Sequence, residues 1–313
     1  MQLDSRVVAL TSCAGYDSRE LADCIDLVLS ALGSLPNFYS CDVLLKPNLI
    51  AVRYGSLPCT EAAFIMSTAR WFLDHGARVS VGDSPVFGTA TTALRALGVA
   101  GKLTGMGVAI RDFSRVRKVT LPGGGKAGVA VAALDCDLLV NLPRVKAHGQ
   151  TGVTLAVKNC FGCLAGLRKP WWHMVYGGRH GSFCGRLLQL LEVLPDSLTL
   201  ADGIEAMHKT GPLHGESYPL KIVAGSANPV ALDRALFEVL SLHPRQSPLM
   251  QECIQAGLEG SLLSDLIFPL TAPGPLQVTD FCVPEVLSPI RFDPFRFMRR
   301  LVRRVMRKNV QRH

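Results

Sequence analysis

Apolar residues follow two different spacings along the chain, and the changes between them predict the order of strands and helices. Short apolar runs predict strands at residues 6–11, 41–45, 78–81, 138–141, 198–201 and 221–224. Apolar residues at helical spacing predict helices at residues 17–33, 60–75, 89–97, 151–164, 183–194, 229–240 and 248–257. Strands that alternate with helices predict an α/β fold, with a mainly parallel sheet and helices on both of its faces.

A glycine-rich stretch interrupts this alternation. Residues 118–121 and 127–132 predict two strands joined through Gly123, Gly124 and Gly125. Three consecutive glycines also suit a phosphate-binding loop, but such a loop opens a helix, and no helix is predicted directly after this one. We therefore expect a β-hairpin inserted into the α/β domain.

The segment from residue 141 to residue 166 concentrates the polar chemistry of the chain. Pro143 is expected to end the strand before it, because proline has no N–H to donate to a neighbouring strand. Lys146 and His148 come next, where the end of a strand would border a ligand-binding site, and residues 149–152 form a turn. Such a position is typical of ligand-binding residues in α/β proteins.

A helix is predicted to open near Thr151 and to carry Thr154 and Lys158 on one face, four residues apart. The free N–H groups and positive dipole end of a helix N-terminus favour an anion, and two lysines and an imidazole lie close by in sequence. This combination predicts a site for a carboxylate or a phosphate. An unpaired buried lysine is costly, so we expect Lys158 either to function there or to pair with an acid.

Polar residues follow four of the predicted strands. If these strands are parallel, their carboxyl ends share one edge of the sheet, which is where ligands bind in open α/β folds. Separate turns are the alternative, because Asp and Asn favour turns in any fold. The residues at the four strand ends are Lys46 and Asn48, Asp83 and Ser84, Lys146 and His148, and Asp202.

These positions suggest roles within one site. His148 is the candidate acid–base group, because an unperturbed imidazole pKa of about 6.5 suits neutral pH. Lys158 and Asp83 are the other candidate catalytic residues, and Asp83 or Asp202 would orient His148 or bind a divalent metal. The candidate ligand-binding residues are Lys46, Asn48, Ser84, Lys146, Thr151, Asn159 and Asp202.

Ten cysteines are spread along the chain, and only Cys160 and Cys163 have the spacing of metal ligands. A C-x2-C pair indicates a metal site strongly only when a second pair exists. Two readings stay open: two buried thiols on the core face of a helix, or ligands of an iron–sulfur cluster with further ligands from elsewhere.

The net charge of +8 belongs entirely to the end of the chain. Residues 1–290 contain 24 basic and 24 acidic residues, whereas residues 291–313 contain nine basic residues and one acidic residue. The balanced body speaks against nucleic-acid binding, which needs a basic face. The tail has apolar residues at helical spacing among its arginines, which predicts a basic amphipathic helix. It suits an anionic membrane surface or an acidic partner, and packing on the body is the alternative.

Domain organisation and location follow from the same observations. We expect one α/β domain over residues 1–290 and the tail over residues 291–313. The first residues do not resemble a secretory signal, and no uncharged apolar run reaches the roughly 18 to 20 residues of a transmembrane helix. The expected location is cytoplasmic, at the inner face of a membrane if the tail binds lipid.

Seven motifs occur in an order that resembles the domain-of-unknown-function 362 family: LLKPNL, VGDSP, NLPRVKAH, AVKNCFG, DGI, GP and NPVALD, between residues 44 and 233. Members of that family are often described as iron–sulfur proteins, and many carry a ferredoxin-like segment of clustered cysteines. This chain has no C-x2-C-x2-C-x3-C run. The resemblance draws attention to Lys46, Asn48, Asp83, Lys146, His148, Lys158, Asn159, Asp202 and Asp233.

Three functions remain open on sequence alone. The first, which we favour, is an enzyme that acts on a small anionic metabolite. The second is an iron–sulfur or other redox-linked protein that uses Cys160 and Cys163. The third is a non-catalytic binding protein recruited to a membrane through residues 291–313. The sequence does not name a cofactor or an oligomeric state.

Overall fold

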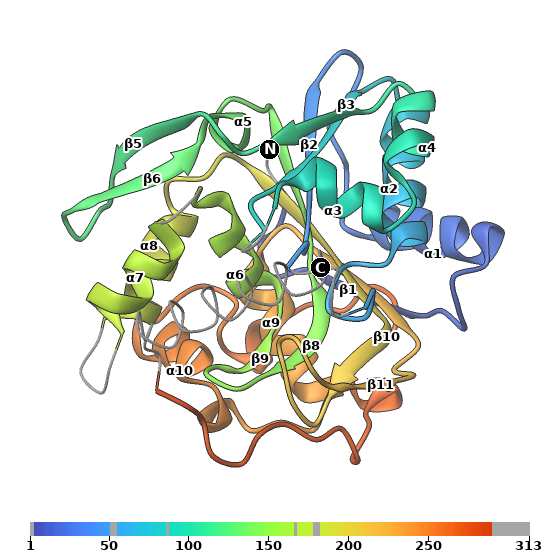
Figure 1. The fold of residues 1–313 in the computed structure, drawn as a ribbon. Coiled ribbons are helices and arrows are strands. Elements are labelled where there is room, and N and C mark those ends of the chain that lie inside the picture. Colours follow the sequence, from blue (N-terminus) through green and yellow to red (C-terminus); the bar gives the residue numbers. More distant parts are fainter. Residues whose placement is uncertain (1–2, 51–54, 86–87, 166–167, 178–181, 290–313) are drawn as a thin grey trace, which may run out of the picture.

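The computed structural model describes residues 3–50, 55–85, 88–165, 168–177 and 182–289, and it is built around one large twisted sheet (Figure 1). The long path of the sheet has the order β1-β12-β10-β7-β2-β3-β4. These strands are β1 (Val8–Ser12), β2 (Asp42–Pro47), β3 (Arg78–Asp83), β4 (Ala109–Asp112), β7 (Leu138–Leu142), β10 (Ser197–His208) and β12 (Ile222–Ser226).

The five strands from β10 to β4 are mutually parallel, and β12 runs antiparallel to both of its neighbours. The prediction of a mainly parallel sheet is therefore confirmed. Because β2, β3, β7 and β10 point the same way, their carboxyl ends meet at one edge. Lys46, Asp83 and Asn141 lie at or near those ends, and Asp202 lies in the middle of β10.

Helices cover both faces of the sheet, as predicted. Side chains alternate along each strand, so that Leu44 packs into one apolar cluster and Leu45 into the other. One face carries α1 (Ser18–Ala31), α2 (Ala62–Asp74), α3 (Ala90–Ala96) and α4 (Ala100–Gly105). The other carries α5 (Val131–Leu134), α6 (Ala156–Asn159), α7 (Arg168–Tyr176), α8 (Phe183–Leu191), α9 (Pro229–Val239) and α10 (Pro248–Gln255).

Local capping explains where two of these helices begin. The Asp17 side chain accepts hydrogen bonds from the first turn of α1, and the Asn228 side chain does the same for α9. Glu20 does not complete a capping box with Asp17, because its carboxylate accepts the backbone N–H of Ala14 instead.

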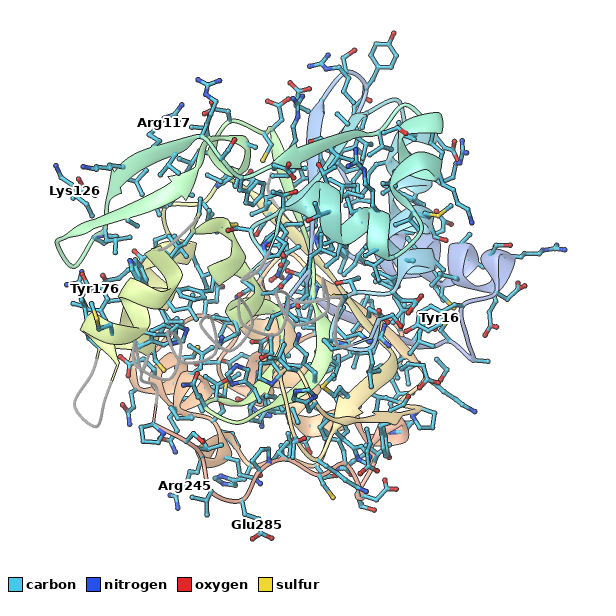
Figure 2. All side chains as sticks on the ribbon, viewed as in Figure 1. Tyr16, Arg117, Lys126, Tyr176, Arg245 and Glu285 are labelled. Carbon is cyan, nitrogen blue, oxygen red and sulfur yellow. The ribbon has the colours of Figure 1, made fainter. Side chains whose placement is uncertain are left out.

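The predicted hairpin forms from β5 (Val116–Thr120) and β6 (Lys126–Ala130), which pair antiparallel. It stands beside α7 and α8 in Figure 1, and its outer end carries Lys126, labelled in Figure 2. Arg186 of α8 donates to the carbonyl of Gly124 at the turn, and this hydrogen bond connects the hairpin to α8.

β7 ends at Leu142, immediately before Pro143, as predicted, but the segment after Pro143 differs from its prediction. The chain does not leave the sheet there but continues as β8 (Arg144–His148), which pairs with the distal half of β10. Proline lacks an N–H, yet its carbonyl accepts the N–H of Asp202 and keeps the strands joined. The 12 residues of β10 thus pair first with β7 and then with β8.

The predicted helix at residues 151–164 was wrong in its first part. Gly152–Thr154 form β9, which pairs antiparallel with β8, and α6 begins only at Ala156. Gly152 has a positive φ of 74° and lies against the carbonyl of Gln246, so glycine fits this tight turn and side chains do not. A 3₁₀ turn, Cys160–Cys163, follows α6, and β11 (Glu216–Tyr218) pairs with the end of β10.

Candidate functional site

Adjacent strands place polar side chains in one row on the face of the sheet beneath α6. The register pairs Lys46 of β2 with Asn141 of β7, and Asn141 with Thr199 of β10. All three side chains are buried. Two residues earlier on their strands, Leu44 and Leu139 belong to the apolar core, so the row marks the boundary between that core and the site.

Asn159, the last residue of α6, connects this row. Its amide oxygen accepts from Asn48 Nδ2 at 2.8 Å and from Lys46 Nζ at 3.4 Å. Its amide nitrogen donates to Asn141 Oδ1 at 2.8 Å and to the Lys46 carbonyl at 3.3 Å. Both donors and both lone pairs of the amide are therefore engaged, and the facing Lys46 ammonium fixes which end is oxygen.

Lys46 has a buried acidic partner inside the protein. Its ammonium lies 3.0 Å from Asp83 Oδ1, and both side chains are almost fully buried. Asp83 Oδ2 also accepts the N–H of Leu49, which holds the segment after β2 against the end of β3. A Cβ at Gly162 would collide with this ion pair, so glycine lets the turn after α6 close over it.

Lys146 is buried without an acidic partner in contact. Its ammonium donates to Asn48 Oδ1 at 2.9 Å and to the Pro58 carbonyl at 2.7 Å, and both acceptors are neutral. Burial lowers the pKa of Lys146 to about 7, since the charged form loses its hydration. Among the neighbouring groups, Cys59 and Asp83 raise this pKa, whereas Lys158 and Arg144 lower it further. The side chain is fully buried.

His148 lies two residues beyond Lys146 on β8, which places both side chains on the same face of the strand. Its Nδ1 accepts the N–H of Gln150 at 3.1 Å, so the neutral ring carries its proton on Nε2. Burial lowers the pKa of His148 well below its usual value, and Lys158 and Lys146 lower it further. The imidazole is therefore neutral at physiological pH.

Lys158 projects from α6 and is partly buried. Its ammonium lies 5.5 Å from the centre of the Phe161 ring. Burial lowers the pKa of Lys158 to about 8. Among the residues that the structure describes, none forms a hydrogen bond or an ion pair with this ammonium.

The N-terminus of α6 is not open to a ligand, contrary to the expectation for a helix start near Thr151. The Asp233 carboxylate of α9 accepts the N–H of Ala156 at 2.6 Å and that of Val157 at 3.2 Å. Burial raises the pKa of Asp233 to about 8, although both hydrogen bonds oppose this. The Asp233 side chain thus occupies this helix end in place of a ligand.

Asp202 belongs to a second polar cluster. Its carboxylate binds Arg144 of β8 at 2.6 Å and accepts the hydroxyl of Tyr16 at 2.7 Å. It also accepts the backbone N–H of Glu61 at 2.9 Å. Tyr16, labelled in Figure 2, lies on the α1 side of the molecule. Every oxygen of Asp202 is engaged by the protein, which leaves it a positioning role.

The structure joins most of the predicted site residues. Lys46, Asn48, Asp83, Lys146 and Asn159 form one continuous network of hydrogen bonds and an ion pair. His148 and Lys158 interact electrostatically with Lys146 at its border. Three predicted residues stand apart from this network: Ser84, which is partly exposed after β3; Thr151, whose hydroxyl donates to the Val153 carbonyl; and Asp202.

Sequence reasoning did not select Asn141, Arg144 or Thr60. Asn141 and Arg144 were visible as polar residues within buried strands, which is uncommon and requires a partner. Thr60 accepts the N–H of Asn48 and donates to the Leu142 carbonyl, so it fixes where Asn48 lies. Nothing local distinguishes it from an ordinary helix-capping threonine.

Cys160 and Cys163 are buried in the core beside α6. Burial raises the pKa of the Cys160 thiol, which disfavours the thiolate form that binds metals. The described residues contain no group of three or more His, Cys, Asp or Glu side chains that could hold a metal ion. None of the ten cysteines, all within the described part of the chain, is disulfide-bonded.

Comparison with known proteins places the chain in a family. The model of the family described as Domain of unknown function (DUF362) matches residues 43–238. The chain belongs to this family. It is also 32% identical over 296 residues to the thylakoid-associated protein sll1697 of Synechocystis sp., across 93% of this chain and 92% of that protein. The resemblance seen in the motifs is therefore confirmed.

Solved structures share only a distant likeness. The lactate racemase apoprotein of Thermoanaerobacterium thermosaccharolyticum matches 76% of this chain with a TM-score of 0.46 and 14% identity. A protein of Thermotoga maritima matches 67% with a TM-score of 0.38 and 11% identity. The chain spans only 59% and 55% of the lengths of these two proteins.

No helix within the described ranges is long and apolar enough to span a bilayer. The predicted basic tail at residues 291–313 lies outside the described residues.

Asn159→Leu tests whether the amide of Asn159 holds the network together. The change removes the Asn159 partner of Asn48 Nδ2, Asn141 Oδ1 and the Lys46 carbonyl, and each buried group left unsatisfied costs about 1–3 kcal/mol. We expect the free energy of unfolding, measured by urea denaturation, to fall by at least about 3 kcal/mol. The matched control is Asn37→Leu at an exposed turn, with an expected change within about 1 kcal/mol. Equal effects of the two changes would contradict the role of Asn159.

Proposed function

We propose that the protein is an enzyme that binds a small metabolite carrying a carboxylate or a phosphate, and that His148 transfers a proton on it. The binding site is the nitrogen cluster, defined as Lys146, His148 and Lys158. One observation carries this proposal: the three nitrogen bases interact electrostatically, yet no described carboxylate is in hydrogen-bond or ion-pair contact with any of them. The other lysine of the site, Lys46, already has Asp83 as its partner.

A bound anion would supply the missing counter-charge. Burial of an ammonium group costs free energy unless an opposite charge lies nearby, and the low pKa values of the two lysines reflect this cost. A carboxylate or phosphate beside the nitrogen cluster would favour the charged lysines and remove much of this penalty. Lys46 was expected to bind the anion as well, but its pairing with Asp83 gives it a structural role in this proposal.

Thr154 provides a second, neutral contact. It pairs with Lys146 across the β8–β9 hairpin, so the two side chains lie on the same face. Its hydroxyl is buried and has no hydrogen-bond partner in the described part of the protein. Buried hydroxyls are normally satisfied, and an oxygen of the bound metabolite would satisfy this one.

His148 is suited to move a proton because its ring is neutral and its orientation is fixed. The Gln150 N–H occupies Nδ1, so the proton on Nε2 is the one that His148 can donate to an oxygen of the metabolite. Asp83 acts on the same site indirectly, because it holds Lys46 and the backbone at Leu49 in place. The reaction class that fits is proton transfer at an atom close to the anionic group.

The binding part of this proposal predicts proton uptake. An anion favours the ammonium form and so raises the low pKa values of Lys158 and Lys146. Protons are therefore taken up on binding near pH 8, and affinity falls as pH rises above about 8. Calorimetry with inorganic phosphate and with acetate, in buffers of different ionisation enthalpy, measures both effects. We expect Lys158→Met to weaken binding at least about tenfold, or 1.4 kcal/mol.

The control for this experiment is Lys102→Met, at an exposed position of α4, which should leave affinity unchanged.

Solvent exchange tests the catalytic part. Small carboxylates incubated with the protein in D2O are followed by proton NMR, and a substrate should gain deuterium near its carboxylate. His148→Gln should abolish this exchange and keep anion binding. Binding without proton uptake would refute the binding part of the proposal. Exchange that survives in His148→Gln would refute the catalytic part.

A second candidate function is association with an anionic membrane surface. The charge of residues 291–313, nine basic residues against one acidic residue, favours it, because residues 1–290 are balanced. The relative named as thylakoid-associated is consistent with it. Membrane association and catalysis are compatible, since the nitrogen cluster lies in the α/β body and the basic residues lie in the tail.

Sedimentation with vesicles tests this association. Each basic residue near an anionic surface contributes about 1 kcal/mol, so replacing Arg299, Arg300, Arg303 and Arg304 by Gln should reduce binding more than about 100-fold. The vesicles contain phosphatidylglycerol and phosphatidylcholine, and pure phosphatidylcholine is the control. Equal binding of the quadruple variant and the natural chain would rule out recruitment through the tail.

A further inference from the structure

We propose that Lys158 is a carbonyl-capturing amine that forms an imine with a small 2-oxo acid. This inference rests on the proposed function, because the carboxylate of the 2-oxo acid would lie in the nitrogen cluster. It adds a covalent step and a narrower substrate class. The argument begins with the different surroundings of the three lysines at the site.

Only one of these lysines combines access with the absence of a partner. Lys46 is fully buried and pairs with Asp83. Lys146 is fully buried and donates to Asn48 and to the Pro58 carbonyl. Lys158 is partly exposed, and within the described ranges its ammonium has neither a hydrogen bond nor an ion pair. An imine-forming lysine needs a free lone pair and a path for the carbonyl, and Lys158 meets both requirements.

Burial in largely apolar surroundings disfavours the charged form of Lys158. A cavity of about 10 Å³ adjoins the side chain and is lined largely by apolar groups including Leu155, Phe237 and Met250. The face of the Phe161 ring, 5.5 Å from the ammonium, gives the cation only a weak attraction. A cavity of this size holds about one water molecule, so it cannot admit a buried counter-ion. The described titratable groups around Lys158 are Lys146 and His148 of β8, Cys184 of α8, Asp233 of α9 and Cys253 of α10.

These surroundings leave a useful fraction of free amine at neutral pH. With a pKa of about 8, roughly a tenth of Lys158 is uncharged at pH 7. An ordinary lysine, with a pKa near 10.4, has about 230-fold less free amine at that pH. Asp233 shares the small cavity with Lys158, but its carboxylate accepts backbone N–H groups of α6 and is not in contact with the ammonium.

The covalent step balances without an oxidant or a reductant. The neutral Lys158 nitrogen attacks the carbonyl carbon, and a proton moves from nitrogen to the former carbonyl oxygen, which gives a carbinolamine. The C–O bond then breaks as the nitrogen lone pair forms the C=N bond, and the hydroxyl takes up one proton from solvent and leaves as water. The products are the protonated imine and one water molecule.

A 2-oxo acid fits this arrangement because its two functional groups are adjacent. With the carbonyl carbon bonded to Lys158, the carboxylate lies within a few ångströms of the same nitrogen, where Lys146 and His148 are the neighbouring bases. A protonated imine withdraws electrons and makes the neighbouring C–H more acidic. This acidity gives the proton transfer proposed at this site a chemical basis.

Reductive trapping tests the imine on the full chain. The protein is incubated with pyruvate and cyanoborohydride, digested, and mapped by peptide mass spectrometry. We expect the reduced adduct on Lys158 at least tenfold above its level on the exposed Lys102 and Lys209. The rate of adduct formation on Lys158 should rise with pH towards a plateau above about pH 8. Mapping on the natural chain does not depend on any variant folding.

Two variants sharpen the result. Lys158→Arg should remove the adduct and keep a cation for anion binding, whereas Lys102→Arg should change nothing at Lys158. Labelling spread evenly over the exposed lysines would overturn the proposal that Lys158 forms the imine. An unchanged total amount of adduct in Lys158→Arg would overturn it as well. If acetate binds with proton uptake but pyruvate is never trapped, the imine is wrong and the proposed function stands. If neither occurs, both are wrong.

Discussion

The structure of the site depends on one constraint, which is that the amide of Asn159 joins α6 to the ends of two parallel strands. Its four hydrogen bonds reach Lys46, Asn48 and Asn141, so the helix cannot shift along the sheet without breaking several of them. Asp233 fixes the other end of the same short helix. Lys158, one residue before Asn159, therefore projects from a firmly held element, as a preorganised reactive group requires.

Charge is distributed unevenly across this framework, and the proposed function rests on that unevenness. Lys46 and Arg144 are buried beside Asp83 and Asp202, so their charges are compensated within the protein. The nitrogen cluster has no such partner in the described part of the chain. Its members remain buried or partly buried with lowered pKa values. Sites of this kind are arranged for an incoming opposite charge or for proton transfer.

Much of the fold followed from sequence, and the reason is the parallel sheet. Alternating strands and helices predicted its direction, and direction alone brought Lys46, Asp83 and Asn141 to one edge. The pairing of Lys46 with Asp83 could not be predicted, because it depends on register. The start of α6 was misplaced because Thr154 and Lys158 also fit helical spacing, although Gly152 closes a hairpin there. Asp233 lies 77 residues from Ala156, so periodicity cannot reveal that contact.

The central claim is that two lysines of the nitrogen cluster lack a counter-charge, and their ionisation tests it most directly. Lysines labelled with ¹³C at Cε can be titrated by NMR, with Lys146→Arg and Lys158→Arg to assign the signals. The account predicts two lysines with a pKa of about 7 and about 8, apart from a group near the ordinary value of about 10.4. Titration of both lysines near 10.4 would show that their charges are compensated, and would contradict the account.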